Sequence, residues 1–146
     1  MSGIVVGVDG SNEARRALEW AISEAGIHNT PLTVITVHQV AVDAWGLAEL
    51  HYPEDEPARE RALEAAQQLV DKTTAQLGAS KPSSVQVKAV NGITAQVLID
   101  QSKDADLLVV GRRGGGFEQF ALGSVSGRVA RHASCPVVVV PAGQDG

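Results

Sequence analysis

The sequence predicts an α/β fold in which a parallel β-sheet lies between two layers of helices. Short apolar runs alternate with longer amphipathic segments along the whole chain, and this alternation is typical of parallel α/β domains. The run from Leu107 to Val110 contains no polar residue at all, and such strands are buried on both faces. Because 146 residues make one ordinary domain, we expect a single domain over 1–146.

The first predicted elements are a strand over 4–8 and a helix that follows it directly. Asp9, Gly10 and Ser11 end the strand as turn residues. Apolar residues then recur at the three- and four-residue spacing of one helix face, with Ser11 as the expected N-cap and Gly26 as the expected stop. The same reasoning predicts further strands over 32–37, 85–90, 105–111 and 136–140, and helices over 58–77, 94–103 and 124–133.

One long segment, 39–57, fits neither a strand nor a helix pattern. It contains Trp45, Tyr52 and a run of acidic residues. Irregular segments of this length are uncommon in compact domains unless they serve a function or are disordered. We therefore expect either a lid over a ligand site or a disordered insert.

Composition excludes several classes of function. The net charge of −5 argues against a nucleic-acid partner bound through its phosphates. No apolar run approaches the ~20 residues that span a membrane, and the N-terminus lacks the basic region of a signal peptide, so a cytoplasmic location is expected. The lone Cys135 allows neither an internal disulfide nor a thiolate-rich metal site.

The most informative segment runs from Gly111 to Ser124 and is rich in glycine. It leaves a buried strand and enters a helix, so the N–H groups of Gly123, Ser124 and Val125 lie at a helix N-terminus, which favours a phosphate. Glycines such as Gly114 allow the backbone to approach a ligand closely. The segment has neither the Gly-Lys-Ser/Thr ending of a P-loop nor the dinucleotide-binding pattern placed after the first strand.

At this point the chain resembles the universal stress protein family over almost its whole length. The resemblance rests on Val6-Gly7-Val8-Asp9-Gly10-Ser11, on Val37-His38, and on the tail, Gly123-Ser124-Val125-Ser126 through Ala133-Ser134-Cys135-Pro136 to Val140. In the ATP-binding branch, the glycine loop reads Gly, two residues, Gly, nine residues, Gly-Ser/Thr. Here eight residues separate Gly114 from Gly123, so the loop is one residue shorter than the family pattern.

The resemblance implies a three-layer sandwich of the adenine nucleotide alpha hydrolase-like type, with a five-stranded parallel sheet in the order 3-2-1-4-5. Strands one and four are then neighbours whose connections leave in opposite directions, and such a switch point is where these sheets bind ligands. The implied ligand is ATP, with or without Mg²⁺, and Asp9 would lie near the ribose or the magnesium ion. The implied nucleotide-binding residues are Gly7, Val8, Asp9, Val37, Gln39, Val110, Gly111, Gly114, Gly123, Ser124, Val125 and Ser126.

The resemblance also implies a homodimer formed through the last strand. Residues 136–140 are apolar and lie at a sheet edge in the implied order, where unpaired backbone groups invite a partner strand. Antiparallel pairing across a two-fold axis is the implied arrangement.

Several functional interpretations remain open from the sequence. The leading one is an ATP-binding regulatory module in the stress response, not an enzyme, with at most slow ATP hydrolysis. The alternatives are an ATP hydrolase or adenylyl-transferring enzyme, and an ATP-free stress protein that acts through protein contacts; AMP or cyclic AMP could replace ATP. Asp9 could be a turn former only. Arg112 and Arg113 could be phosphate contacts or solvated charges, and His38 could pack, contact the ligand or act in catalysis.

Overall fold

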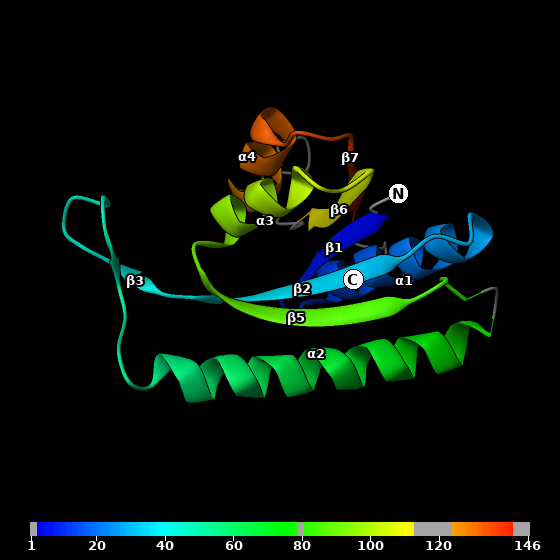
Figure 1. Cartoon of the computed structure of the whole chain (residues 1–146), viewed down its shortest axis with the longest axis horizontal. Coiled ribbons are helices and arrows are strands. Elements are labelled where there is room, and N and C mark those ends of the chain that lie inside the picture. Colours follow the sequence, from blue (N-terminus) through cyan, green and yellow to red (C-terminus); the bar gives the residue numbers. More distant parts are fainter. Residues whose placement is uncertain (1–2, 79–80, 113–123, 142–146) are drawn as a thin grey trace.

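The computed structural model describes residues 3–78, 81–112 and 124–141, and its centre is one sheet of five parallel strands (Figure 1). The strands lie in the order β5-β2-β1-β6-β7, and each neighbouring pair is parallel. This order is the expected 3-2-1-4-5, so the predicted fold class is confirmed. The bounds are β1 Ile4–Val8, β2 Leu32–Gln39, β5 Val85–Gly92, β6 Leu107–Arg112 and β7 Val137–Pro141.

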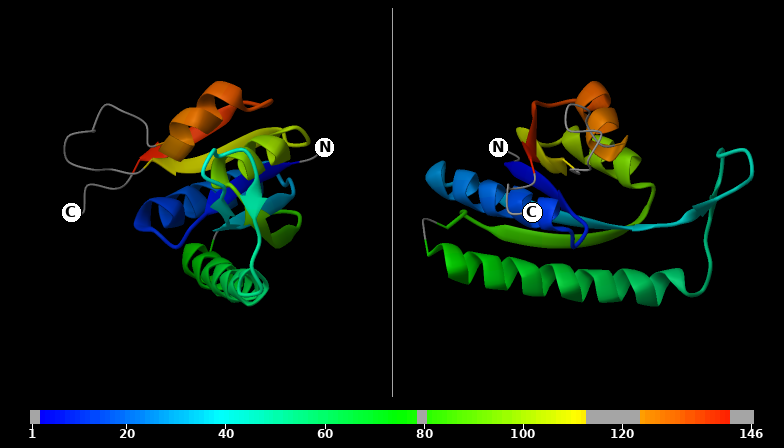
Figure 2. Two further views of the ribbon diagram at one scale, coloured as in Figure 1. Left: turned by 90° about the vertical axis from the view of Figure 1, so that its left-hand side faces the viewer. Right: turned by 180° about the vertical axis from the view of Figure 1, so that it is seen from behind.

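Two helices cover each face of the sheet (Figures 1 and 2). The helices α1 (Asn12–Ile27) and α2 (Asp55–Leu77) cover one face, and α3 (Thr94–Ser102) and α4 (Ser124–His132) cover the other. Alternate residues of each strand therefore enter different cores: Val6 and Val109 pack toward α1, whereas Val5 and Leu108 pack toward α3. Among the described helices, none combines the length and the apolarity that crossing a membrane requires.

The helix ends follow the predicted signals at two positions and depart from them at two others. Ser11 caps α1, because its Oγ accepts a hydrogen bond from Ala14 N at 3.1 Å, and Gly78 ends α2 with φ 57°. The expectation that Gly26 stops α1 is wrong: Gly26 is buried within the helix, which continues to Ile27. The helix α2 begins at Asp55, earlier than the expected residue 58, because acidic residues and a proline both suit a first helical turn.

The segment 39–57 is more ordered than its sequence pattern indicates. It contains a short antiparallel hairpin made of β3 (Ala41–Val42) and β4 (Glu49–Leu50), so the expectation of an irregular stretch is corrected. We call residues 41–52 the arm. Figure 1 and the right-hand view of Figure 2 show the arm projecting beyond the carboxyl end of β2, apart from the sheet and the helices.

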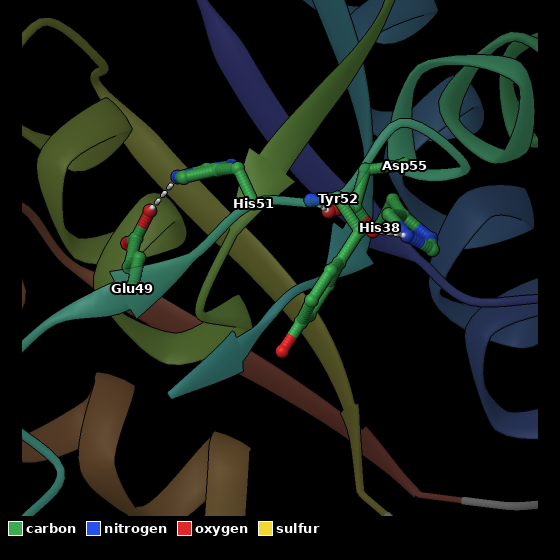
Figure 3. A network of polar contacts seen from close by, with 5 residues as sticks. All are labelled: His38, Glu49, His51, Tyr52 and Asp55. Atoms are coloured by element: carbon green, nitrogen blue, oxygen red, sulfur yellow. Dashed lines mark hydrogen bonds and ion pairs between the residues drawn. The ribbon is translucent and has the colours of Figure 1, made fainter. Parts of the chain in front are cut away.

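Polar contacts hold the base of the arm where the chain enters α2 (Figure 3). His38, near the end of β2, has its Nε2 2.9 Å from Oδ1 of Asp55. The other carboxylate oxygen of Asp55 accepts a hydrogen bond from Tyr52 N at 2.7 Å. The Tyr52 N–H, and then His38, hold the pKa of the Asp55 carboxyl below its usual value. Asp55 therefore ties the end of the arm to the end of β2.

A close approach between β6 and α1 explains why Gly111 must be a glycine. A Cβ at Gly111 would lie 2.7 Å from both the carbonyl carbon and the oxygen of Glu13 in the first turn of α1. Backbone atoms cannot move aside as a side chain can. The end of β6 therefore packs directly against the start of α1, and only glycine permits this distance.

We predict that Gly111→Ala destabilises the fold by about 1–3 kcal/mol, the usual cost of forcing an extra methyl group into a packed interior. Gly7→Ala is the matched control. The three atoms nearest to its Cβ would all belong to the Leu98 side chain, with the two methyl carbons at 3.0 and 3.1 Å, and the end of a side chain can shift. Urea unfolding of both variants measures the two free energies. A loss for Gly7→Ala equal to or above that for Gly111→Ala would contradict the analysis.

We predict that the Tyr52 amide reports the ionisation of Asp55. Because the folded pKa of Asp55 is lowered, its contacts are fully formed above the unfolded value of about 3.9 and are lost as the pH falls through the folded value. The Tyr52 amide resonance should therefore titrate with a midpoint below about 3.9, followed by NMR. Asp55→Asn should abolish this titration; a midpoint at or above the unfolded value would show that the contact does not form.

Candidate functional site

A cavity of about 410 Å³ opens at the carboxyl ends of the central strands. Its volume lies within the range of small-molecule sites, about 300–1,000 Å³. Residues of β1, β2 and β6 form one side of it, and residues of α3 and α4 form the other. The lining residues are Gly7, Val8, Asp9, Ser11, Glu13, Ala14, Ile35, Val37, Gln39, Thr94, Leu98, Val110, Gly111, Val125 and Ser126.

The cavity exists because β1 and β6 stop pairing before either strand ends. Their register runs from Ile4↔Leu107 to Val6↔Val109, whereas β1 remains paired with β2 as far as Val8↔Thr36. After β1 the chain enters α1 on one face of the sheet, and α4, which comes after β6, lies on the other. Connections that leave in opposite directions create the crevice in which open parallel sheets bind ligands.

The walls of the cavity combine apolar and polar surfaces. Ile35 and Val37 of β2, Val110 of β6, Leu98 of α3 and Val125 of α4 supply apolar contacts. Pockets that are mainly apolar, with a few placed polar groups, are typical of sites for small organic ligands.

Polar groups lie where β1 turns into α1. Asp9 is exposed, and its Oδ1 accepts a hydrogen bond from Ser11 N at 2.9 Å. Asp9 is therefore a turn former and a cavity residue at once. The carboxylate-bearing Glu13 lines the same cavity. Within the described residues no group of three or more His, Cys, Asp or Glu side chains could hold a metal ion, so any Mg²⁺ here would also need oxygens from a ligand and from water.

The side chain of Gln39 is held by the first turn of α3. Its Oε1 accepts hydrogen bonds from Thr94 N at 3.2 Å and from Thr94 Oγ1 at 2.8 Å. Gln39 thereby satisfies one of the backbone donors left open at a helix start. This contact fixes the distance between the end of β2 and α3, and thus the width of the cavity on that side.

The structure brings together most of the residues that the sequence analysis selected, although their roles in binding remain predictions. Those that line the cavity are Gly7, Val8, Asp9, Val37, Gln39, Val110, Gly111, Val125 and Ser126. Ser124 is the first residue of α4, directly before Val125. Gly114, Gly123 and Arg113 lie outside the described residues. His38 does not line the cavity; its side chain contacts Asp55 instead (Figure 3).

Sequence reasoning missed the contributions of α3 and of the first turn of α1. Thr94 and Leu98 line the cavity from α3, and Glu13 from α1. A signal for α3 was present, since Gly92 ends β5 and α3 begins at Thr94. The carboxyl ends of parallel strands meet at one edge of a sheet, so each strand-to-helix junction on the same face is a candidate wall.

Comparison with known proteins identifies the family. The model of the universal stress protein family matches residues 1–141. A universal stress protein of Mycolicibacterium smegmatis is 39% identical over 143 residues, which cover 94% of this chain and 47% of that protein. The chain thus spans about half the length of the curated relatives it matches.

Solved structures show the same fold. The universal stress protein UspA from Lactobacillus plantarum superposes with a TM-score of 0.71 at 22% identity, covering 95% of this chain and 97% of that one. A universal stress protein crystallised in complex with cAMP has a TM-score of 0.67 at 26% identity, with 97% of both chains covered. The family match over nearly the whole chain, together with this shared fold, shows that the chain belongs to the universal stress protein family.

Proposed function

We propose that this chain binds ATP in the cavity between β1 and β6 and acts as a nucleotide-dependent regulatory module in the stress response. The observation that carries the proposal is the placement of α4: its first turn, through Val125 and Ser126, lines the same cavity as the divergent ends of β1 and β6. One ligand can thus contact an apolar wall and a helix N-terminus together. A cytoplasmic location accompanies this proposal.

The apolar wall suits the base of a nucleotide. Ile35, Val37 and Leu98 form a surface on which a flat ring would be removed from water. The relative with cAMP in its crystal structure supports an adenine nucleotide as the ligand of this chain.

The first turn of α4 suits the phosphates. Ser124–His132 is a helix of 9 residues, and its first backbone N–H groups have no partner within the helix itself. These donors and the helix dipole favour an anion. Ser126, which is buried and lines the cavity, adds a hydroxyl group close to this turn.

The charge of the cavity favours a nucleotide that carries a divalent cation. Asp9 and Glu13 both line the cavity and would repel a bare triphosphate. A Mg²⁺ ion bound to the phosphates and approached by the Asp9 carboxylate would remove this repulsion, since Mg²⁺ is commonly held by one or two carboxylates plus phosphate oxygens. AMP and cyclic AMP, with fewer charges, would need the cation less.

We expect ATP turnover to be slow or absent. Rapid phosphoryl transfer requires a group that orients the attacking water. His38, the most obvious base near the end of β2, contacts Asp55 and does not line the cavity. Asp9 already accepts a hydrogen bond from Ser11 N. A steady-state assay of phosphate release in excess ATP separates this proposal from the alternative of an ATP hydrolase.

We predict that Asp9→Ala lowers the affinity for ATP at least tenfold in Mg²⁺, which corresponds to a lost charged contact of about 1.5–3 kcal/mol. The loss should be smaller in EDTA, because the carboxylate acts through the cation. Isothermal calorimetry measures both conditions. Asp104→Ala, which removes an exposed carboxylate outside the cavity, is the matched control and should bind as the wild type does.

Two outcomes would contradict the proposal. The first is a wild type that gives no binding heat and carries no nucleotide on purification. The alternative of an ATP-free protein that acts through protein contacts would then replace the proposal. If Asp9→Ala loses equal affinity with and without Mg²⁺, the carboxylate does not approach a cation.

We also propose a homodimer in which β7 pairs with its counterpart across a two-fold axis. β7 is an edge strand of the sheet, and its four valines are only partly buried. A flat apolar edge with open backbone groups is the form of strand that pairs with another copy.

We predict that Val138→Lys weakens this dimer, because a charged side chain at an apolar sheet edge opposes strand pairing. Light scattering should show a lower mass than for the wild type at equal concentration. Val85→Lys, on the opposite edge strand β5, is the control and should leave the mass unchanged. Thermal unfolding of both variants checks that each chain still folds; a folded Val138→Lys protein with the wild-type mass would rule out the β7 interface.

A further inference from the structure

The arm gathers most of the exposed large apolar side chains that the described part of the chain carries. Five of the seven such residues lie within it, and Trp45 and Leu47 are 84% and 86% exposed. The other two, Ile27 and Val85, lie singly on α1 and β5. Apolar residues scattered singly are ordinary, whereas several exposed apolar side chains gathered in one short segment favour a contact with another molecule. The five arm residues are Val42, Trp45, Leu47, Leu50 and Tyr52.

The tip of the arm is a turn held by hydrogen bonds. The Oδ1 atom of Asp43 accepts hydrogen bonds from Leu47 N at 2.8 Å and Trp45 N at 3.2 Å, and Asp43 N donates to Ala48 O at 2.9 Å. Gly46 supplies the positive φ of 70° that the turn requires. These bonds hold the backbone at Trp45 and Leu47 in one conformation before any partner arrives, which lowers the entropic cost of binding.

The arm is held at its base and packs little on the part of its own chain that the structure describes. Val40 N donates to Gly92 O at 3.1 Å on one side, and Asp55 accepts from Tyr52 N on the other. Between these anchors the arm stands apart from the sheet and helices in Figure 1 and in the right-hand view of Figure 2, and it rises toward the side of the sheet that α3 and α4 cover. A two-stranded hairpin alone is marginal in water, so a partner would stabilise it.

Charge indicates what that partner is. The arm contains two acidic residues, Asp43 and Glu49, and no lysine or arginine. The exposed face of α4 carries Arg128 and Arg131, neither of which has an ion-pair partner among the residues that the structure describes. The same chain therefore presents an acidic apolar arm and an unpaired basic helix face, and complementary charges of this kind guide association.

We infer that the arm of one copy docks on the α4 surface of a second copy, and that the second arm docks reciprocally on the first. Such an exchange uses the same two surfaces twice and closes under two-fold symmetry. It differs from pairing through β7, because the arm follows β2 and leaves the sheet on the side away from that edge. Trp45 and Leu47 supply the apolar contact, and Arg128 and Arg131 supply the charge.

The test is the mass of the assembly, measured by light scattering coupled to gel filtration. The double variant Trp45→Ser/Leu47→Ser should form an assembly of half the wild-type mass. This holds whether or not pairing through β7 also contributes to the assembly. Ile27→Ser, which removes an apolar side chain that is 71% exposed and lies outside the arm, is the matched control and should keep the wild-type mass. Thermal unfolding confirms that each variant is folded.

A second pair of measurements identifies the docking surface. Arg128→Glu/Arg131→Glu should also halve the mass, and mixing this protein with the arm variant should recover association, because one intact arm can then meet one intact α4. An unchanged mass for the arm variant would overturn the inference. So would arm amides whose hydrogen exchange is protected to the same degree above and below the concentration at which the assembly dissociates, since docking between copies would then add no protection.

Discussion

Pairing between β1 and β6 joins the two halves of the sheet, and its length determines where a ligand can enter. On one side lie β5, β2 and β1, and on the other β6 and β7. The ladder between the halves covers Ile4 to Val6, and the backbone of Gly3 extends it by accepting from Asp106 N at 2.9 Å. Beyond Val6 the strands diverge, and α1 crosses the gap by packing on both β1 and the end of β6 at Gly111. The cavity is the space that this divergence leaves on the opposite face.

The parts of the fold that sequence predicts are those fixed by local chemistry or by strict burial. The wholly apolar run from Leu107 to Val110 is typical of a central strand, and three of its four residues, Leu108 to Val110, are buried. Ser11 could cap α1 without help from distant residues. Gly26 was misread because a glycine signals either a stop or a close contact, and only tertiary packing distinguishes the two. The hairpin in the arm was not predicted because strands of two residues show no periodicity, and because its turn depends on the single carboxylate of Asp43.

The residues of the candidate site likewise fall into those that the sequence could predict and those that it could not. Residues at the ends of β1 and β6 could be selected from sequence, because a switch point follows from the order of the strands. Thr94 and Leu98 could not, since their place in the cavity depends on how α3 packs across the sheet, and that packing is set by contacts such as Gln39 to Thr94. His38 looked like a site residue because it ends a strand at the right edge, yet its contact is with Asp55. Its neighbour Val37 lines the cavity, and alternation along the strand places His38 on the other face of the sheet.

The attachment of the arm has a consequence for how such a protein can diversify. Both of its ends are fastened by contacts that belong to the body, Val40 to Gly92 and His38 to Asp55, while nothing between them enters either core. Substitutions or insertions between these fastenings leave the sheet, the helices and the cavity unaltered. Mutations in this one segment can therefore change which partner the protein binds, while the cavity and the ligand that it binds stay the same.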